Sequence, residues 1–320
     1  MTVSRVVNGD ANVGAEKRER VAAAIAALGY VPNRAARSLA GGRDCRIALL
    51  HNNPSAGYLS ELLVGCLAEV GAADIQLTVE YCDGENDHAL AERLGKHRID
   101  AALLPSPLAD DPGLLDALRR MKLPIVQIAT ARPADFATAV TIDDEAAAHA
   151  MTSHLLSRGH RRIGFIMGST KQSSAELRKE GYLRALREAG VPIEPRLIQQ
   201  GYFTYRSGMI AAEALVTLDP RPTAIFASND DMAAAAIAVA HKHRLDVPAQ
   251  ISIVGFDDTP LATTIWPELT TVRQPIQEMA RLATRFAVEA ARGHLPARHH
   301  RLNFELVLRQ SDAAPGGDAV

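Results

Sequence analysis

The sequence predicts an α/β protein in which a small helical segment precedes two doubly wound lobes. From Arg46 onward, short apolar runs alternate with helical stretches, a pattern typical of parallel sheets covered on both faces. This part spans about 270 residues, more than one such lobe usually needs. Charge also divides the chain, because residues 1–46 hold eight Lys and Arg against four Asp and Glu, whereas the remainder holds 27 against 33.

A basic end on an acidic body indicates contact with nucleic acid at that end, although a solvated charged face would give the same asymmetry. The hydrophobic fraction of 47% is ordinary for a globular protein with a real core. The cysteines, Cys45, Cys66 and Cys82, are odd in number and show no metal-like spacing, which favours a reducing compartment. We expect a cytoplasmic protein, since no apolar run approaches the roughly 20 residues that span a bilayer.

At the N-terminus, residues 2–8 can form a short helix that Asn8-Gly9-Asp10 ends. A second helix is predicted from Ala15 to Leu28, with Val21, Ile25 and Leu28 on one face. Although Lys and Arg precede its apolar part, no cleavage site follows, so a signal peptide is not indicated.

Residues 30–42 come next, where Pro32 can open a helix and Gly41-Gly42 end it. Two helical turns are marginal alone in water, so this segment either orders against a partner or is a linker that happens to be helical.

In the body, the expected strands are Ile47–Asn52, Ile75–Tyr81, Ala101–Leu104, Ile125–Thr130, Ile163–Met167, Leu197–Gly201, Thr223–Ala227 and Ile251–Gly255. The helical stretches between them include Leu59–Val70, Ala146–Ser157, Ala175–Glu188, Ser207–Leu218 and Asp231–His243. Catalytic motifs are missing: the sequence contains no Gly-x-Ser-x-Gly, Walker loop or Gly-x-Gly-x-x-Gly after a strand. His241, His243 and the His299-His300 pair lack a third ligand type nearby, so we predict neither an enzyme nor a metal or other cofactor.

Two motifs carry a family resemblance. Residues 30–40, Tyr-Val-Pro-Asn-Arg-Ala-Ala-Arg-Ser-Leu-Ala, resemble the hinge segment of the lactose/galactose-repressor family of bacterial transcription regulators. Residues 2–9, Thr-Val-Ser-Arg-Val-Val-Asn-Gly, resemble that family's recognition helix and the turn after it. The resemblance continues to Leu308-Arg309-Gln310-Ser311 and so covers nearly the whole chain.

The resemblance implies a domain organisation. Residues 1–44 would form an all-α DNA-binding head, a partial helix-turn-helix plus a hinge helix. Residues 45–312 would form a two-lobed, periplasmic-binding-protein-like effector and dimerisation domain. Its first lobe would hold about 45–143 and 274–299, its second about 144–273 and 300–312, and residues 313–320 would be a flexible tail. The apolar stripe of the first body helix, formed by Leu59, Leu62, Leu63, Cys66, Leu67 and Val70, would lie partly in the core and partly at a homodimer interface.

The same resemblance implies DNA contacts. Arg5 can donate two hydrogen bonds to a guanine in the major groove, and Leu39 of two hinge helices would wedge into the minor groove and kink the duplex. The full set of implied DNA-binding residues is Thr2, Ser4, Arg5, Asn12, Tyr30, Asn33, Arg34, Ala36 and Leu39.

The chain departs from the family at its start. It begins inside the recognition helix, and a helix-turn-helix requires a first helix and a turn before it. We therefore expect on the order of 15 further residues upstream by that geometry, and a mis-assigned start codon. Gly14 also stands where the family usually has a Ser or Thr cap.

The effector site is expected between the lobes, near the carboxyl ends of strands. Asn229 follows a strand, although it could simply cap a helix, and Asp257 ends another strand. Arg178 and Phe203 match family positions that grip and stack on a ligand. The complete implied set is Asn52, Tyr58, Ser174, Arg178, Phe203, Asn229 and Asp257.

These residue types suit a pyranose, and a nucleoside or purine would also fit. Ala129 stands at a position that is often acidic in the family, which removes one expected hydroxyl contact. The prediction is a homodimeric, cytoplasmic repressor of sugar genes that binds double-stranded operator DNA and a small-molecule effector. The alternative is a sugar-binding sensor without competent DNA binding.

Overall fold

The computed structural model describes residues 6, 13–28, 45–70, 75–82, 87–294 and 299–316. The chain divides into two compact units, residues 1–44 and 45–320. In the first, helix α2 spans Ala15–Leu28, the bounds that the sequence predicts. Val21 and Ile25 are half-buried, whereas Leu28 is 80% exposed. Apart from Val6, the expected helices over residues 2–8 and 30–42 lie outside the described residues.

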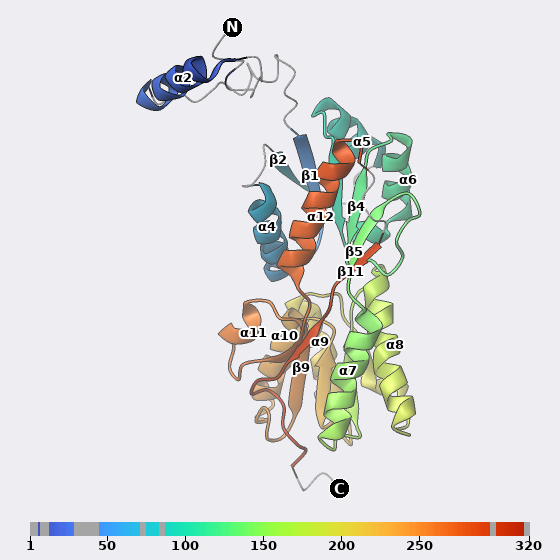
Figure 1. The fold of residues 1–320 in the computed structure, drawn as a ribbon. Coiled ribbons are helices and arrows are strands. Elements are labelled where there is room, and N and C mark those ends of the chain that lie inside the picture. The colour runs from blue at the N-terminus through green and yellow to red at the C-terminus, as the bar shows by residue number, and fades with distance from the viewer. Residues whose placement is uncertain are drawn as a thin grey trace. The chain divides into compact units, whose positions relative to one another are not determined.

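The first lobe of the second unit contains a parallel six-stranded sheet in the order β11-β5-β4-β3-β1-β2. Helices α4 and α12 pack together on one face, and α5 and α6 lie together on the other (Figure 1). The strands are β1 (Cys45–His51), β2 (Ile75–Tyr81), β3 (Ala101–Pro105), β4 (Ile125–Ile128), β5 (Thr138–Thr141) and β11 (His299–Arg301). The helices are α4 (Ala56–Val70), α5 (Asp87–Lys96), the 3-10 turn η1 (Leu108–Asp110), α6 (Pro112–Arg120) and α12 (Ile276–Ala291).

The second lobe repeats this plan with the strand order β12-β10-β9-β8-β6-β7, in which only the β10–β12 pair is antiparallel. Helices α7 and α8 cover one face, and α9 and α10 cover the other (Figure 1). The strands are β6 (Ile163–Met167), β7 (Ile198–Gln200), β8 (Ala224–Ala227), β9 (Ser252–Asp257), β10 (Thr270–Arg273) and β12 (Glu305–Val307). The helices are α7 (Asp144–Ser157), α8 (Ser173–Glu188), η2 (Pro195–Leu197), α9 (Tyr205–Val216), α10 (Asp230–Lys242) and the short α11 (Leu261–Thr264).

Strand β1 shows why the central strands are continuously apolar. Ile47 and Leu49 join the core cluster beneath α4 and α12, whereas Ala48 and Leu50 join the cluster beneath α5 and α6. All four are fully buried, because successive side chains point to opposite faces and both faces are covered. The predicted two-lobed, doubly wound fold is therefore present.

The chain crosses between the lobes three times. The crossings lie between β5 and α7, between β10 and α12, and between β11 and β12. Asp143, at the first crossing, caps α7 by accepting a hydrogen bond from the Ala146 N–H at 3.0 Å. It also pairs with Arg301 at the end of β11, at 2.8 Å, so two of the crossings are joined by an ion pair.

The sequence does not predict four of the strands, β5, β10, β11 and β12. Strand β10 is the instructive case, because Thr270 and Thr271 are fully buried although threonine is usually exposed. Their hydroxyls donate to the carboxylates of Asp312 at 2.5 Å and Asp230 at 2.7 Å. Burial is therefore tolerated because each hydroxyl is paired, and a hydropathy pattern cannot show that.

The sequence predicts a flexible tail from residue 313, but Ala313 is still hydrogen-bonded to the second lobe. The Ala313 carbonyl accepts from His160 Nε2 at 2.8 Å, and the Ala313 N–H donates to Ser252 Oγ at 3.0 Å. Asp312 and Ser311 before it are buried. The end of the chain is thus bound to lobe two at least as far as Ala313.

Helix α4 carries the predicted apolar stripe. In the stripe, Leu62 and Cys66 are buried in the core, whereas Leu67 is 57% exposed. Val64, outside the predicted stripe, is 47% exposed. Gly65 lies against α12, and a Cβ there would be 2.2 Å from the Gln277 carbonyl oxygen. The stripe therefore divides between core and surface. In the described part of the chain, we find no helix with the length and apolar character required to cross a membrane.

We expect Gly181→Ala to lower the free energy of unfolding by about 1–3 kcal/mol or more. A Cβ at Gly181 in α8 would be 2.2 Å from the Glu145 carbonyl oxygen of α7, so the two helices would have to separate. The control is Gly95→Ala in α5, where the nearest atom is Met121 Cε at 3.7 Å and we expect a gain of about 0.5–1 kcal/mol. Urea denaturation of both variants measures the effect, and equal changes would contradict the close α7–α8 packing.

Candidate functional site

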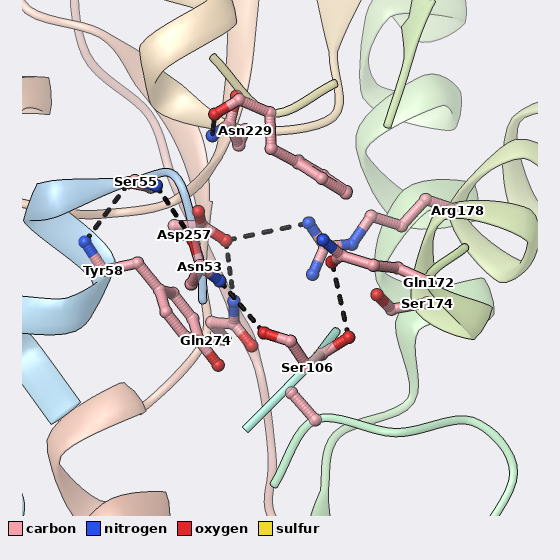
Figure 2. A pocket seen from close by; sticks show the side chains of 12 residues that line it. Asn53, Ser55, Tyr58, Ser106, Gln172, Ser174, Arg178, Asn229, Asp257 and Gln274 are labelled. Carbon is pink, nitrogen blue, oxygen red and sulfur yellow. Dashed lines mark hydrogen bonds and ion pairs between the residues drawn. The ribbon is translucent and has the colours of Figure 1, made fainter. Parts of the chain in front are cut away.

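A cavity lies between the two lobes of the second unit (Figure 2). It holds about 340 Å³ of space without protein atoms, part of it open to solvent. Both lobes contribute to its wall, mostly through polar side chains. The lining residues are Asn53, Ser55, Tyr58, Ser106, Ala129, Gln172, Ser174, Arg178, Phe203, Asn229, Asp257 and Gln274.

The topology explains why these residues meet. Asn53 follows β1 and Ser106 follows β3 in the first lobe, whereas Asn229 follows β8 and Asp257 ends β9 in the second. In each lobe, therefore, the carboxyl edge of the parallel sheet faces the cavity, which is where open α/β sheets usually bind ligands.

Arg178 is the central charge of the cavity wall and is only 4% exposed. Its Nε donates to Asp144 Oδ1 at 2.8 Å, and its Nη1 donates to the Ser228 carbonyl at 2.6 Å and lies 3.7 Å from Asp257 Oδ1. The guanidinium carbon also stands 3.6 Å from the ring centroid of Phe256. Two carboxylates of its own lobe thus neutralise this cation before any ligand binds.

Three buried carboxylates of the second lobe, Asp144, Asp230 and Asp257, hold protons more tightly than usual. Burial raises the pKa of Asp144, and Arg178 opposes that rise. Burial likewise raises the pKa of Asp257 well above its ordinary range, although Arg178 and the Gln274 amide favour its charged form. Burial raises the pKa of Asp230, which lies behind Asp257 in α10, to about 7. The carboxyl groups around Arg178 therefore either carry more negative charge than this one cation balances or keep some of their protons.

Two polar atoms of the cavity wall lack a hydrogen-bond partner among the described residues. They are the hydroxyl oxygen of Tyr58 and Oε1 of Gln274, and both are buried. Gln274 uses its Nε2 to donate to Asp257 at 2.6 Å, so its oxygen is left as an acceptor (Figure 2). Burial raises the pKa of Tyr58, so its hydroxyl is a donor at neutral pH. Unpaired buried polar groups are costly, and a ligand hydroxyl could satisfy both.

The cavity wall also contains unusual backbone conformations. Ala129, Phe203 and Asp257 have φ of 59°, 60° and 115°, in the left-handed region that residues other than glycine rarely adopt. The Phe203 ring packs directly on Gly168, where a Cβ would be 1.9 Å from the ring. Such conformations cost on the order of 1–3 kcal/mol each and concentrate at functional sites.

Six of the seven residues that the sequence proposes for an effector line this one cavity: Tyr58, Ser174, Arg178, Phe203, Asn229 and Asp257. Asn52 is not among the described lining residues; its neighbour Asn53 is. Asn229 also caps α10, accepting from the Met232 N–H at 3.0 Å, so the helix-cap interpretation holds as well.

Six lining residues are not among the effector contacts that the sequence proposes: Asn53, Ser55, Ser106, Ala129, Gln172 and Gln274. Its position soon after the predicted strand Ala101–Leu104 could have identified Ser106. The proposed DNA-binding residues, Thr2, Ser4, Arg5, Asn12, Tyr30, Asn33, Arg34, Ala36 and Leu39, lie outside the described residues.

We expect Arg178→Ala to destabilise the protein by about 3–5 kcal/mol, because it leaves buried Asp144 and Asp257 without their counter-charge. The matched control is Arg184→Ala, six residues along the same helix. Arg184 is 41% exposed and pairs with Glu145 and Glu188, so its loss should cost less than about 1 kcal/mol. Chemical denaturation compares the two, and similar losses would contradict a structural role for Arg178.

Asp230 should make stability depend on pH. Its pKa of about 7 in the folded protein lies above the ordinary value, so the folded state keeps a proton that the unfolded chain has lost. Its contribution to stability is therefore present at low pH and is lost as pH rises towards 7. Relative to Asp230→Asn, the wild type should lose about 3 kcal/mol of unfolding free energy between pH 5 and 8. A constant difference across that range would contradict the raised pKa.

The comparisons with known proteins agree with this geometry. Residues 1–33 match the model for bacterial regulatory proteins of the lacI family, and residues 152–311 match that for a periplasmic binding protein-like domain. Catabolite control protein A of Priestia megaterium is 33% identical over 315 residues, covering 95% of this chain and 93% of that protein. The transcriptional regulator GalS of Salmonella typhimurium is 32% identical over 321 residues, covering 100% of this chain and 94% of that protein.

Two solved structures show the same architecture. A complex of the regulator CelR with cellobiose superposes with a TM-score of 0.78 at 30% identity, covering 96% of this chain and 94% of that one. The Lac repressor dimer bound to operator superposes with a TM-score of 0.82 at 25% identity, covering 98% of this chain and 95% of that one. These regulators are not enzymes. An interlobe cavity, the two-lobed fold and full-length similarity together lead to one conclusion: the chain belongs to the lacI family of bacterial transcription regulators.

Proposed function

We propose that this protein is a homodimeric repressor of genes for sugar uptake or catabolism, controlled by an uncharged, hydroxyl-rich effector in the interlobe cavity. The observation that carries this proposal is the cavity itself, which combines a neutralised arginine with two unpaired polar atoms. Full-length similarity to regulators that include a ribose operon repressor supports the sugar class.

The charge of the cavity favours a neutral ligand. Arg178 is the sole basic side chain among the described lining residues, and Asp144, Asp257 and a backbone carbonyl already occupy it. A carboxylate or phosphate would face Asp257 and would compete with Asp144 and the Ser228 carbonyl for Nε and Nη1 of Arg178. A sugar hydroxyl can instead accept from Tyr58, donate to Gln274 Oε1, or donate to Asp257 without moving any charge.

Effector binding in the cavity would change DNA binding in the way that the family resemblance implies. In this proposal Thr2, Ser4 and Arg5 read base edges in the major groove, and Leu39 of the hinge wedges into the minor groove. The effector changes lobe closure, and closure changes how the hinge segments order on DNA. The exposed Val64 and Leu67 on α4 would lie in the dimer contact, as the dimeric state of the Lac repressor supports.

The test begins with genomic fragments selected by the full-length protein. We expect enrichment of a palindromic site, whose affinity a neutral sugar then changes. The sugar panel pairs each neutral compound with its anions: D-glucose with glucose 6-phosphate and D-glucuronate, and D-ribose with ribose 5-phosphate. Thermal denaturation should show stabilisation by a neutral member alone, and fluorescence anisotropy should show its effect on DNA affinity.

Leu39→Ala provides the control. It should weaken binding to the selected site and leave the sugar-induced rise in melting temperature unchanged. Stabilisation by the anions alone would contradict the neutral-effector proposal, and absence of any enriched DNA site would contradict the repressor proposal. A sugar response without DNA selection would favour a sensor without competent DNA binding.

A further inference from the structure

Helix α8 begins without a cap from its own lobe. Gln172 occupies the cap position, and its side chain makes no capping hydrogen bond. Instead the Ser173 N–H, in the first turn, donates to Asp110 Oδ2 at 2.9 Å. Asp110 ends η1 in the other lobe. A carboxylate at a helix N-terminus satisfies free backbone donors and interacts favourably with the helix dipole.

Asp110 and Ser173 both make further hydrogen bonds that hold this contact in place. Asp110 Oδ1 accepts from the Ser173 hydroxyl at 2.7 Å and from the Thr130 hydroxyl of its own lobe at 2.6 Å. The Ser106 hydroxyl, also in its own lobe, is 3.3 Å from Asp110 Oδ2. The Ser173 oxygen in turn accepts from the Ala131 N–H of the first lobe at 2.7 Å. Three hydrogen bonds therefore connect Ser173 to the opposite lobe.

Other hydrogen bonds cross the interlobe space from residues that line the cavity. Ser106 donates to Gln172 at 3.3 Å (Figure 2), and Ser55 donates to Asp231 at 2.5 Å. A ligand in the cavity can compete for these two contacts. Asp110 is not among the described lining residues, so its contact does not require that the cavity be empty.

We propose that Asp110 is an interlobe latch: it caps α8 only when the lobes are closed, and so sets how far closure is favoured without a ligand. Opening would leave the first amide of α8 without its carboxylate partner. Because α8 carries Ser174 and Arg178, closure also places these two residues at the cavity. Asp110 is thus a positioning residue that need not touch the ligand.

The consequence for regulation rests on the proposed function. If the closed form is the one that binds the effector, apparent affinity scales with the closed fraction. A latch that favours closure therefore raises sensitivity to the effector. The latch itself requires neither an effector nor DNA.

The experiment compares Asp110→Ala with Asp111→Ala in the full chain without added ligand. Asp111 is the matched control, because it caps α6 within the first lobe through the amides of Gly113 and Leu114 at 3.0 and 3.2 Å. Hydrogen–deuterium exchange reads the two helix starts, and small-angle X-ray scattering reads the radius of gyration. Asp110→Ala should speed exchange at the start of α8 by roughly 5–30-fold and raise the radius of gyration.

Asp111→Ala should speed exchange at the start of α6 alone and leave the radius of gyration unchanged. If Asp110→Ala does not fold, Asp110→Asn keeps the shape, removes the charge and should give a smaller change of the same kind. Wild-type exchange at α8 and an unchanged radius of gyration in the folded variant would overturn the latch. Neither readout depends on DNA or sugar, so failure of the proposed function would leave this result interpretable.

Discussion

The second lobe depends on one buried cation. The Arg178 guanidinium lies between the start of α7, the loop after β8 and the end of β9, through Asp144, Ser228 and Asp257. Phe256 covers its face. A charge this deeply buried is stable only with counter-charges and hydrogen bonds, so the positions of these three elements follow from its requirements. Arg178 and Asp257 also line the cavity, so the same arrangement forms part of the cavity wall.

The same constraint governs what the cavity can bind. An arginine in a ligand site is usually interpreted as an anion receptor, since its planar fork matches carboxylate and phosphate. Here Nε and Nη1 of that fork are engaged inside the protein, and two buried atoms of the cavity wall that lack a partner among the described residues are a phenol oxygen and an amide oxygen. The proposed effector chemistry is therefore recognition of hydroxyl groups. Strand β1 begins directly after the N-terminal unit and ends two residues before Asn53, so the cavity is linked by a single strand to residues 1–44.

Much of the fold could be predicted from the sequence, because buried parallel strands are continuous apolar runs. Strand β6 has the bounds that its run of Ile, Phe and Met predicts. Strand β10 could not be found in this way, because its buried threonines are compatible with a core only through partners distant in sequence, Asp230 and Asp312. The same limit applies to Gln274, which follows that strand. Asp110 is a further example, since its partner Ser173 belongs to the other lobe.

The candidate site was partly predictable for a related reason. Asn229 and Asp257 follow recognisable strands, so their position at a sheet edge could be inferred. The state of Arg178 could not, because sequence spacing does not show which carboxylates fold against it.

The most direct test is a crystal structure of the protein with its effector bound. We predict an uncharged ligand whose hydroxyls contact Tyr58, Gln274 and Asp257, while Arg178 keeps its 2.8 Å contact with Asp144. A ligand carboxylate or phosphate against Arg178, with that contact broken, would contradict this description of the cavity.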